Sequence, residues 1–67
     1  MTEIGAGVDE TGTLSRDGGG FLLRRDLGGH YRLILLRVPV DHVEKRVRVR
    51  GRYMGDDVVE AEGVAPA

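Results

Sequence analysis

The stretch His30-Tyr-Arg-Leu-Ile-Leu-Leu-Arg-Val38 decides the fold that this 67-residue chain is expected to adopt. It contains the longest unbroken apolar run of the sequence, Leu33–Leu36, and that run is too short for a substantial helix. Its aliphatic and aromatic residues suit a strand that other strands surround. We therefore expect this stretch to be the central strand of a small all-β barrel.

Two turns predict the strands that precede it. Thr11–Ser15 is short and β-prone, and it leads to Asp17-Gly18, a pair favoured in two-residue type I′ hairpins because both positions need a positive φ. Phe21–Asp26 is the second strand, and Leu27-Gly28-Gly29 is the turn before the central strand. The chain therefore begins with two tight hairpins.

The side-chain period of two decides which residues share a face of the second hairpin. If Leu23 pairs with Leu33 in the interior, the outer face carries opposed pairs. These are Leu22 with Ile34, Arg24 with Arg32, and Asp26 with His30. Like charges directly opposite each other destabilise a sheet, and either a bound anion or the nearby Asp26 would relieve the contact between Arg24 and Arg32.

A helical connection is expected after the central strand. Pro39 ends that strand because it lacks the N–H group that a β-ladder needs. Asp41-His-Val-Glu44 then has the spacing of a capping box, in which both acids accept from backbone N–H groups at the start of a helix. We expect one or two helical turns that plug an open end of the barrel.

The remaining sequence predicts a third hairpin. Arg46–Tyr53 alternates, with valines on one face and arginines on the other, which is typical of a half-buried strand. Gly55-Asp56-Asp57 turns the chain into a last strand, Val58–Val64. Glu60 and Glu62 of this strand are expected to lie beside the arginines of its neighbour.

The resulting order is strand–strand–strand–short helix–strand–strand. This is the order of the OB-fold, a five-stranded Greek-key barrel, whereas an SH3-like barrel, the runner-up, needs no helix between its third and fourth strands. We predict a flexible tail over residues 1–8 and a single OB-fold-like domain over residues 9–67. The predicted core consists of Leu14, Phe21, Leu23, Tyr31, Leu33, Leu35, Val43, Val47, Val49, Val59 and Ala61.

Composition excludes several kinds of site and location. The chain has no cysteine, so disulfides and thiolate zinc sites are excluded. No segment approaches the roughly 20 apolar residues that a membrane-spanning helix needs. Met1–Val8 lacks the basic and apolar regions of a signal peptide. We expect a cytoplasmic protein that does not contact a membrane.

The net charge of −1 conceals a segregation of charge along the chain. All lysines and arginines lie between Arg16 and Arg52, and the segments on either side carry acids only. A barrel brings strands together that are distant in sequence. We therefore expect the acidic flanks to pair with the basic middle.

Several short segments resemble small bacterial OB-fold proteins of unknown function. They are Thr11-Gly-Thr-Leu14, Phe21-Leu-Leu-Arg24, Arg32-Leu33, Val47-Arg-Val-Arg-Gly51 and Val59-Glu-Ala-Glu-Gly-Val64. In such proteins a Val-x-Val-x-Gly strand is followed by a short loop and a closing strand. The resemblance extends from about Glu10 to Pro66, and it implies a fold without implying a reaction.

No residue is predicted to be catalytic, to bind a cofactor or to ligate a metal. The glycine runs at residues 18–20 and 28–29 precede neither a helix nor a Gly-Lys-Ser/Thr motif, so they predict turns rather than a phosphate loop. His42-Val43-Glu44 matches half of a zinc-deaminase signature whose other half needs cysteines. Ser15 has no suitably spaced histidine and acid. We expect a protein that is not an enzyme.

A basic surface is one candidate site. OB-folds commonly bind single strands across their second and third strands. Together with the fourth strand, this surface would present Arg24, Arg32, Arg48, Arg50 and Arg52. Single-strand binding usually relies on exposed aromatic rings, and this chain has one Phe and two Tyr, so such binding would be weak.

An apolar strip is the other candidate. Leu22, Ile34 and Leu36 fall on the face opposite the core residues, where they would suit a protein partner or a homodimer interface. A bend in the central strand would instead cover both of its faces near Leu36. Our primary prediction is a non-enzymatic binding or protein-interaction module, and weak single-stranded nucleic-acid binding is the alternative.

Overall fold

Five β-strands make up the regular structure of the chain. The computed structural model describes residues 3–35 and 42–67. In chain order the strands are β1 (Gly7–Asp17), β2 (Gly20–Arg25), β3 (His30–Ile34), β4 (Arg46–Gly55) and β5 (Val58–Pro66). Neither described range contains an α-helix, nor therefore one long and apolar enough to cross a membrane. The all-β class predicted from the sequence is confirmed.

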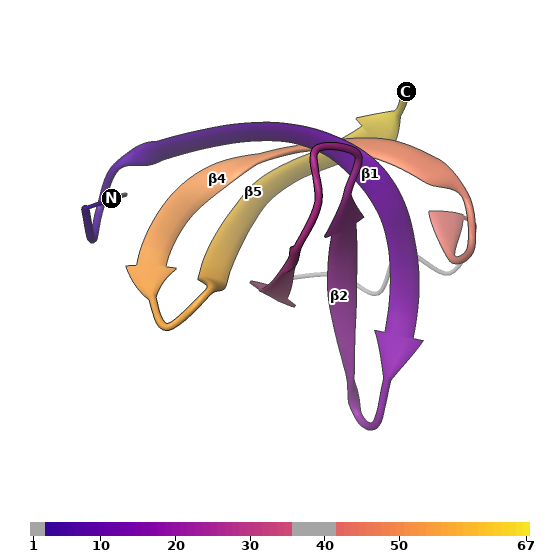
Figure 1. The fold of residues 1–67 in the computed structure, drawn as a ribbon, viewed down its shortest axis with the longest axis horizontal. Coiled ribbons are helices and arrows are strands. Elements are labelled where there is room, and N and C mark those ends of the chain that lie inside the picture. The colour runs from indigo at the N-terminus through magenta and orange to yellow at the C-terminus, as the bar shows by residue number, and fades with distance from the viewer. Residues whose placement is uncertain (1–2, 36–41) are drawn as a thin grey trace.

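The strands form one closed sheet. β1 pairs antiparallel with both β2 and β4, β2 pairs antiparallel with β3, and β4 pairs antiparallel with β5, whereas β3 and β5 are parallel. The order around the sheet is β1-β2-β3-β5-β4, and the β1–β4 pairing closes it. In Figure 1, β1 arches across the molecule, and its first half runs beside β4 while its second half runs beside β2.

β1 exchanges one partner for the other near Gly12. In the β1–β4 ladder Gly12 is opposite Val47, and in the β1–β2 ladder it is opposite Arg25. A strand that serves two neighbours in this way must bend, and glycine in a strand often marks a bend or a close approach of another backbone. Gly51 occupies a comparable place in β4, where the β4–β5 register shifts.

Aliphatic and aromatic side chains fill the interior of the sheet. Alternation along each strand directs them inward. The fully buried side chains are Leu14, Leu23, Val47, Val49 and Val59. Every residue predicted for the core lies in it or packs against it, although Leu35 and Val43 are only partly buried. Val8 is an additional core residue that the sequence analysis assigned to the tail.

The sheet begins before the expected domain boundary at residue 9. β1 starts at Gly7, and Val8 is buried. The Gly5 N–H donates to the carbonyl of Tyr53 at 2.6 Å, and the Tyr53 N–H donates to the carbonyl of Ala6 at 2.9 Å. Residues 5–8 are therefore tied to β4 rather than separate from the domain.

The first hairpin forms with its loop one position later than predicted. Asp17 pairs with Gly20, so the two loop residues are Gly18 and Gly19. Gly18 has a φ of 59°, whereas Gly19 has no positive φ. A positive φ at the first loop position alone is typical of a type II′ turn rather than the type I′ turn that Asp17-Gly18 predicts.

The β2–β3 register differs from the predicted one by two residues. The observed pairs are Phe21 with Leu33, Leu22 with Arg32, Leu23 with Tyr31, and Arg24 with His30. The predicted contact between opposed Arg24 and Arg32 is therefore wrong. Because the shift is even, every side chain of this hairpin still lies on its predicted face.

A longer turn causes this shift. The turn occupies residues 26–29 rather than 27–29, so Asp26 does not pair with His30 in the ladder. The Arg25 N–H donates to the carbonyl of Gly29 at 3.0 Å, and Gly28 and Gly29 both have positive φ values. Consecutive glycines make such a loop accessible, and the sequence alone did not fix its length.

The predicted helix after the central strand is wrong. Asp41, its expected N-cap, and residues 36–40 lie outside the described residues. Glu44 has a φ of 65°, which is incompatible with a right-handed helix. Its N–H donates to the carbonyl of Leu14 at 2.7 Å, and the Leu14 N–H donates to the carbonyl of Lys45 at 3.0 Å. Pairing with β1 therefore replaces the helical hydrogen bonds that a capping box would begin.

Candidate functional site

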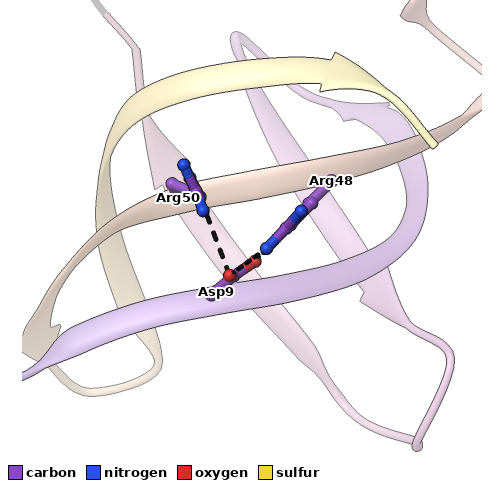
Figure 2. A network of polar contacts seen from close by, with 3 residues as sticks. All are labelled: Asp9, Arg48 and Arg50. Atoms are coloured by element: carbon purple, nitrogen blue, oxygen red, sulfur yellow. Dashed lines mark hydrogen bonds and ion pairs between the residues drawn. The ribbon is translucent and has the colours of Figure 1, made fainter.

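Arginines line the outer face of β4, and a carboxylate of β1 binds two of them. Arg48 donates from Nε to Oδ1 of Asp9 at 2.7 Å and from Nη2 to Oδ2 at 2.5 Å, which is a bidentate contact. Arg50 Nε lies 3.7 Å from Oδ2 of the same residue. Figure 2 shows both arginines of β4 extending toward this single acid. Asp9 therefore compensates much of the charge of this part of β4.

The hydrogen bond from Arg48 is the main cause that lowers the pKa of Asp9. Partial desolvation opposes this shift, and the charges of Arg48 and Arg50 reinforce it. The hydrogen bond with Asp9 in turn raises the pKa of Arg48. A carboxyl that acts as a general acid near neutral pH needs a raised pKa, so Asp9 has the properties of an ion-pair partner.

The two ends of the arginine row also have acidic partners. Arg46 donates from Nε to Oδ2 of Asp26 at 3.1 Å, and its Nη2 contacts the same oxygen. This hydrogen bond raises the pKa of Arg46. Arg52 Nε lies 3.9 Å from Oε1 of Glu62. Arg52 is thus the β4 arginine that pairs with β5, as the sequence analysis expected of the whole row.

The expected pairing between the acidic flanks and the basic middle of the chain is confirmed, although some of the individual partners differ from those expected. Asp9 from the N-terminal flank and Glu62 from the C-terminal flank both contact β4 arginines. The sequence analysis did not assign a partner to Asp9, because it placed only β5 beside β4. The one available signal was the segregation of charge along the chain.

A hollow opens on the outer face of the first three strands, and we call it the β1–β3 hollow. It is lined by Ser15, Arg16 and Asp17 of β1, by Leu22, Arg24 and Arg25 of β2, and by Gly29 and His30 at the start of β3. Leu22 supplies its apolar surface, and it is half-buried. The other side chains that line it are polar or charged.

Arg24 is the distinctive residue of this hollow. It lies on the outer face of β2, is exposed, and is opposite Thr13 on one side and His30 on the other. Among the outer-face arginines of the described strands, the other five each lie within ion-pair distance of a carboxylate. Arg24 has no such carboxylate in the part of the chain that the structure describes.

The rim of the hollow carries an ion pair. Arg32 of β3 donates from Nη2 to Oδ2 of Asp17 at 3.2 Å, across the end of β2. Asp17 is therefore an acid that lines the hollow, and its charge is already compensated. Arg32 sits beside the hollow rather than opposite Arg24, as the corrected register requires.

Arg25 forms the inner edge of the hollow and is held from two sides. Its guanidinium lies 4.7 Å from the centre of the Tyr31 ring, which is a cation–π geometry. Its Nη2 lies 3.2 Å from Oε1 of Glu10. The Nε atom is buried and has no hydrogen-bond partner in the described structure. Arg25 is thus a half-buried structural residue that borders the site.

Ser15, His30 and Asp17 share the hollow but do not form a catalytic triad. Ser15 is opposite Leu22, whereas His30 is opposite Arg24, so the two residues lie on different strands and in different rows. Asp17 is bonded to Arg32 instead of orienting the imidazole. A triad needs hydrogen bonds from nucleophile to base and from base to acid. The described residues also contain no group of three potential metal ligands from His, Cys, Asp and Glu.

The basic surface predicted from the sequence is divided in the structure. Arg24 lines the hollow and Arg32 stands at its rim. Arg48, Arg50 and Arg52 lie on β4, which is separated from β2 by β1, and acids occupy them. The aromatic rings do not extend this surface, because Phe21 and Tyr31 are buried and Tyr53 is half-buried with its hydroxyl accepting from the Asp57 N–H.

The predicted apolar strip is interrupted. Leu22 is half-buried and opposite Arg32, while Ile34 is 46% exposed and opposite Glu60 of β5. Leu36, the third predicted member, lies outside the described residues. Leu22 and Ile34 share the outer face, and the side chain of Arg32 emerges between their positions.

Comparison with known proteins identifies a family. A scan against protein-family models matches residues 11–67 to "Protein of unknown function (DUF5818)". The chain belongs to the DUF5818 family. No curated protein and no solved structure gives a match. In this DUF5818 chain the matched residues include all the residues that line the β1–β3 hollow. The family description agrees with the predicted resemblance to small proteins of unknown function.

Proposed function

We propose that this DUF5818 chain is a small cytoplasmic OB-fold protein of bacterial type that acts as a non-enzymatic binding module for an anionic ligand. The fold part of the proposal is supported by the all-β architecture and by five strands in one closed sheet, since the OB-fold is a five-stranded Greek-key barrel. OB-folds commonly bind ligands over the face of their second and third strands. The β1–β3 hollow lies there.

The observation that carries the proposal is the state of Arg24. The other outer-face arginines of the described strands have acids beside them, and like charges that lie close together on a sheet destabilise it. Arg24 instead faces an open hollow next to His30, with no carboxylate of the described chain in range. An anion from solution would supply the missing partner.

The residues around Arg24 suit binding better than turnover. The guanidinium offers a planar fork of donors that matches an oxyanion. Ser15 offers a hydroxyl, and Leu22 offers a small apolar surface. The acids near these groups are held in ion pairs with Arg32 and Arg25, and this leaves them poorly suited to proton transfer.

The test is titration of the ¹⁵N-labelled chain with anionic probes at low salt, followed by amide chemical shifts. Inorganic phosphate, single-stranded DNA, single-stranded RNA and polyglutamate serve as probes. We expect at least one probe to shift the amides of Ser15, Leu22 and Arg24, and Arg24→Ala to abolish those shifts. The proposal is wrong if none of the probes shifts these amides, or if the shifts survive in the Arg24→Ala variant.

Weak single-stranded nucleic-acid binding is a narrower form of this proposal. It would use Arg24 directly, and it would need Arg32, Arg48, Arg50 and Arg52 to leave their acids. The buried aromatic rings leave base stacking without a platform. We therefore expect such binding to depend on phosphate contacts alone.

Association with a protein partner or a second copy is a separate candidate. Ile34 is 46% exposed on the same outer face as Leu22, and a small domain gains stability from burying such residues. Sedimentation of the parent and of Ile34→Ser over a range of concentrations tests it. A monomer at every concentration would remove self-association from consideration.

A further inference from the structure

We infer that the β1–β3 hollow takes a single phosphate group of a phosphomonoester, rather than successive phosphates of a polynucleotide. The inference rests on the proposed function, because it names the anion that would meet Arg24. Sugar phosphates, nucleotides and the phosphorylated end of a strand all present this group. The experiment below separates the free small molecules from the strand end.

The distribution of compensated charge limits the ligand to one phosphate. A bound strand needs a succession of cations that follow its backbone. On the outer face such a succession exists in sequence, from Arg46 to Arg52, but Asp26, Asp9 and Glu62 occupy it. Arg24 and Arg16 are the arginines of the described chain without a carboxylate in ion-pair distance, and both line this one hollow.

The donors around Arg24 match a compact oxyanion. Arg24 can offer two parallel N–H groups, an arrangement that fits phosphate geometry. His30, directly opposite on β3, can offer an imidazole N–H. Ser15 lies one outer-face row away on β1 and adds a hydroxyl. These three side chains come from three adjacent strands and line one hollow, so a single tetrahedral group can meet donors from each side.

The boundary of the hollow disfavours a longer polyanion. At one side, Arg32 is held in an ion pair with Asp17, so it is not a free cation for a second phosphate. At the floor, half-buried Leu22 offers an apolar contact to the carbon skeleton that carries the phosphate. Phe21 and Tyr31 are buried and Tyr53 is half-buried, so none of these rings is exposed to hold a following base.

The first experiment compares ligands that differ only in their phosphate. The full chain, ¹⁵N-labelled, is titrated with ribose 5-phosphate, with AMP and with adenosine, and amide shifts are recorded. We expect ribose 5-phosphate and AMP to shift the amides of Ser15, Leu22, Arg24 and His30 with similar affinities. Adenosine should leave them unchanged. Equal binding of adenosine and AMP would overturn the inference.

Matched variants locate the effect. Arg24→Ala and Arg50→Ala remove the same charge from the outer face, but Arg50 lies beside Asp9 on β4. We expect Arg24→Ala to weaken AMP binding about tenfold or more, since a charge-assisted contact is lost. Arg50→Ala should bind AMP like the parent. Equal weakening by the two substitutions would show a diffuse charge effect and overturn the inference. The amide spectrum of each variant verifies that it is folded.

The salt dependence of oligonucleotide binding shows whether the chain contacts one phosphate or several. Removal of the 5′-phosphate tests whether the strand end is what binds. Binding of an oligonucleotide that carries a 5′-phosphate should fall with salt along a log–log slope of about −0.7, the value for one phosphate contact on a single strand. Engagement of the five predicted arginines would give a slope of roughly −3.5. Removal of the 5′-phosphate should abolish binding.

These outcomes distinguish failure of the inference from failure of the proposed function. A steep slope that is independent of the terminal phosphate, without binding of AMP, overturns the inference and leaves the anion-binding proposal standing. No response to any of these ligands, to inorganic phosphate, to polyglutamate or to either nucleic acid overturns both. Binding of AMP but not of the phosphorylated strand end identifies the ligand as a free phosphomonoester.

Discussion

The carbonyl oxygen of Arg24 lies 2.1 Å from the position that a β-carbon would take on Gly12. The carbonyl oxygen of Glu60 stands in the same relation to Gly51, at 2.0 Å. Both oxygens belong to the backbone of a neighbouring strand, so they cannot turn aside as the end of a long side chain could. The sheet closes by bringing strands to a separation that only glycine permits at these two positions.

Alanine at Gly12 or Gly51 should therefore destabilise the fold. A methyl group at either site forces neighbouring backbone apart, and we expect a loss of at least about 1–3 kcal/mol in the free energy of unfolding. Urea denaturation of each variant measures it. Gly63→Ala is the control, because no atom lies within 4 Å of its added carbon. Equal stability of Gly12→Ala and Gly63→Ala would contradict this account of closure.

Leu33→Ala should remove the anchor of β3. The Leu33 side chain is almost fully buried in the core, and truncation of a buried leucine costs roughly 2–5 kcal/mol. In so small a domain that loss is expected to unfold much of the population. Leu27→Ala is the matched control because Leu27 is 84% exposed in the β2–β3 turn. Thermal melts followed by circular dichroism should separate the two variants clearly, and coincident melts would remove β3 from its central role.

Asp9 should make stability depend on pH in acid. Its pKa is lowered in the folded chain, chiefly by the hydrogen bond from Arg48, so its ionised form favours the folded state. This contribution is complete above the unfolded pKa of about 3.9 and is lost as the pH falls through the lower folded value. Asp9→Asn should be less stable than the parent at neutral pH, and the difference should close on acidification.

Urea denaturation of both proteins at neutral pH and in acid measures this convergence. Glu3→Gln is a suitable control, since Glu3 is exposed and has no ion pair within the described ranges. A difference between parent and Asp9→Asn that stays constant with pH would show that the carboxylate charge is irrelevant. High salt should reduce the difference at neutral pH, because the pair is exposed.

The β4–β5 turn can be improved. Asp56 and Asp57 have φ values of 51° and 60°, so both loop residues are in the left-handed region that a type I′ turn needs. Asn-Gly is the preferred pair there, and replacing Asp56-Asp57 by it should raise stability by roughly 0.5–1 kcal/mol, or a few degrees in Tm. Replacement by Ala-Ala should lower Tm, because alanine does not favour a positive φ. The same melts test both changes, and a Tm that rises with Ala-Ala would refute the strain argument.

The alternation of apolar and polar residues made the core predictable from the sequence. The register was harder to predict, because it depends on the lengths of the turns. Leu23 and Leu33 were expected in the interior and are there, although they do not face each other. The predicted β2–β3 register differs from the observed one by two residues because Asp26 lies in the turn with the glycines. The local sequence does not decide whether Asp26 ends β2 or begins the turn. Side chains kept their faces because a slip of two preserves the pleat.

Partners across the closed sheet were much harder to predict. Arg48 was expected beside the glutamates of β5, yet its bidentate partner is Asp9 of β1, the other neighbour of β4. A strand in a closed sheet has two neighbours, and the alternation of one strand does not say which neighbour supplies the acid. The helix expected at Asp41 failed for a similar reason, since Glu44 and Lys45 bond to Leu14 of distant β1. Arg24 remains a candidate because it lacks an acid, which is visible only once the other outer-face arginines of the described strands have been assigned theirs.

We expect the parallel contact between β3 and β5 to form late in the folding of the chain. It consists of three residue pairs, Arg32–Val58, Leu33–Val59 and Ile34–Glu60, with the Arg32 N–H donating to the carbonyl of Asp57 at 2.8 Å. The β1–β4 and β3–β5 pairings both join segments that are distant in sequence, but β1–β4 has seven residue pairs and the β3–β5 seam has three. The β3–β5 seam should be the last contact to form during folding and the first to part in the native state. The amide hydrogen of Arg32 would then exchange with solvent sooner than the amide hydrogens of β4, because the closed sheet would open locally between β3 and β5.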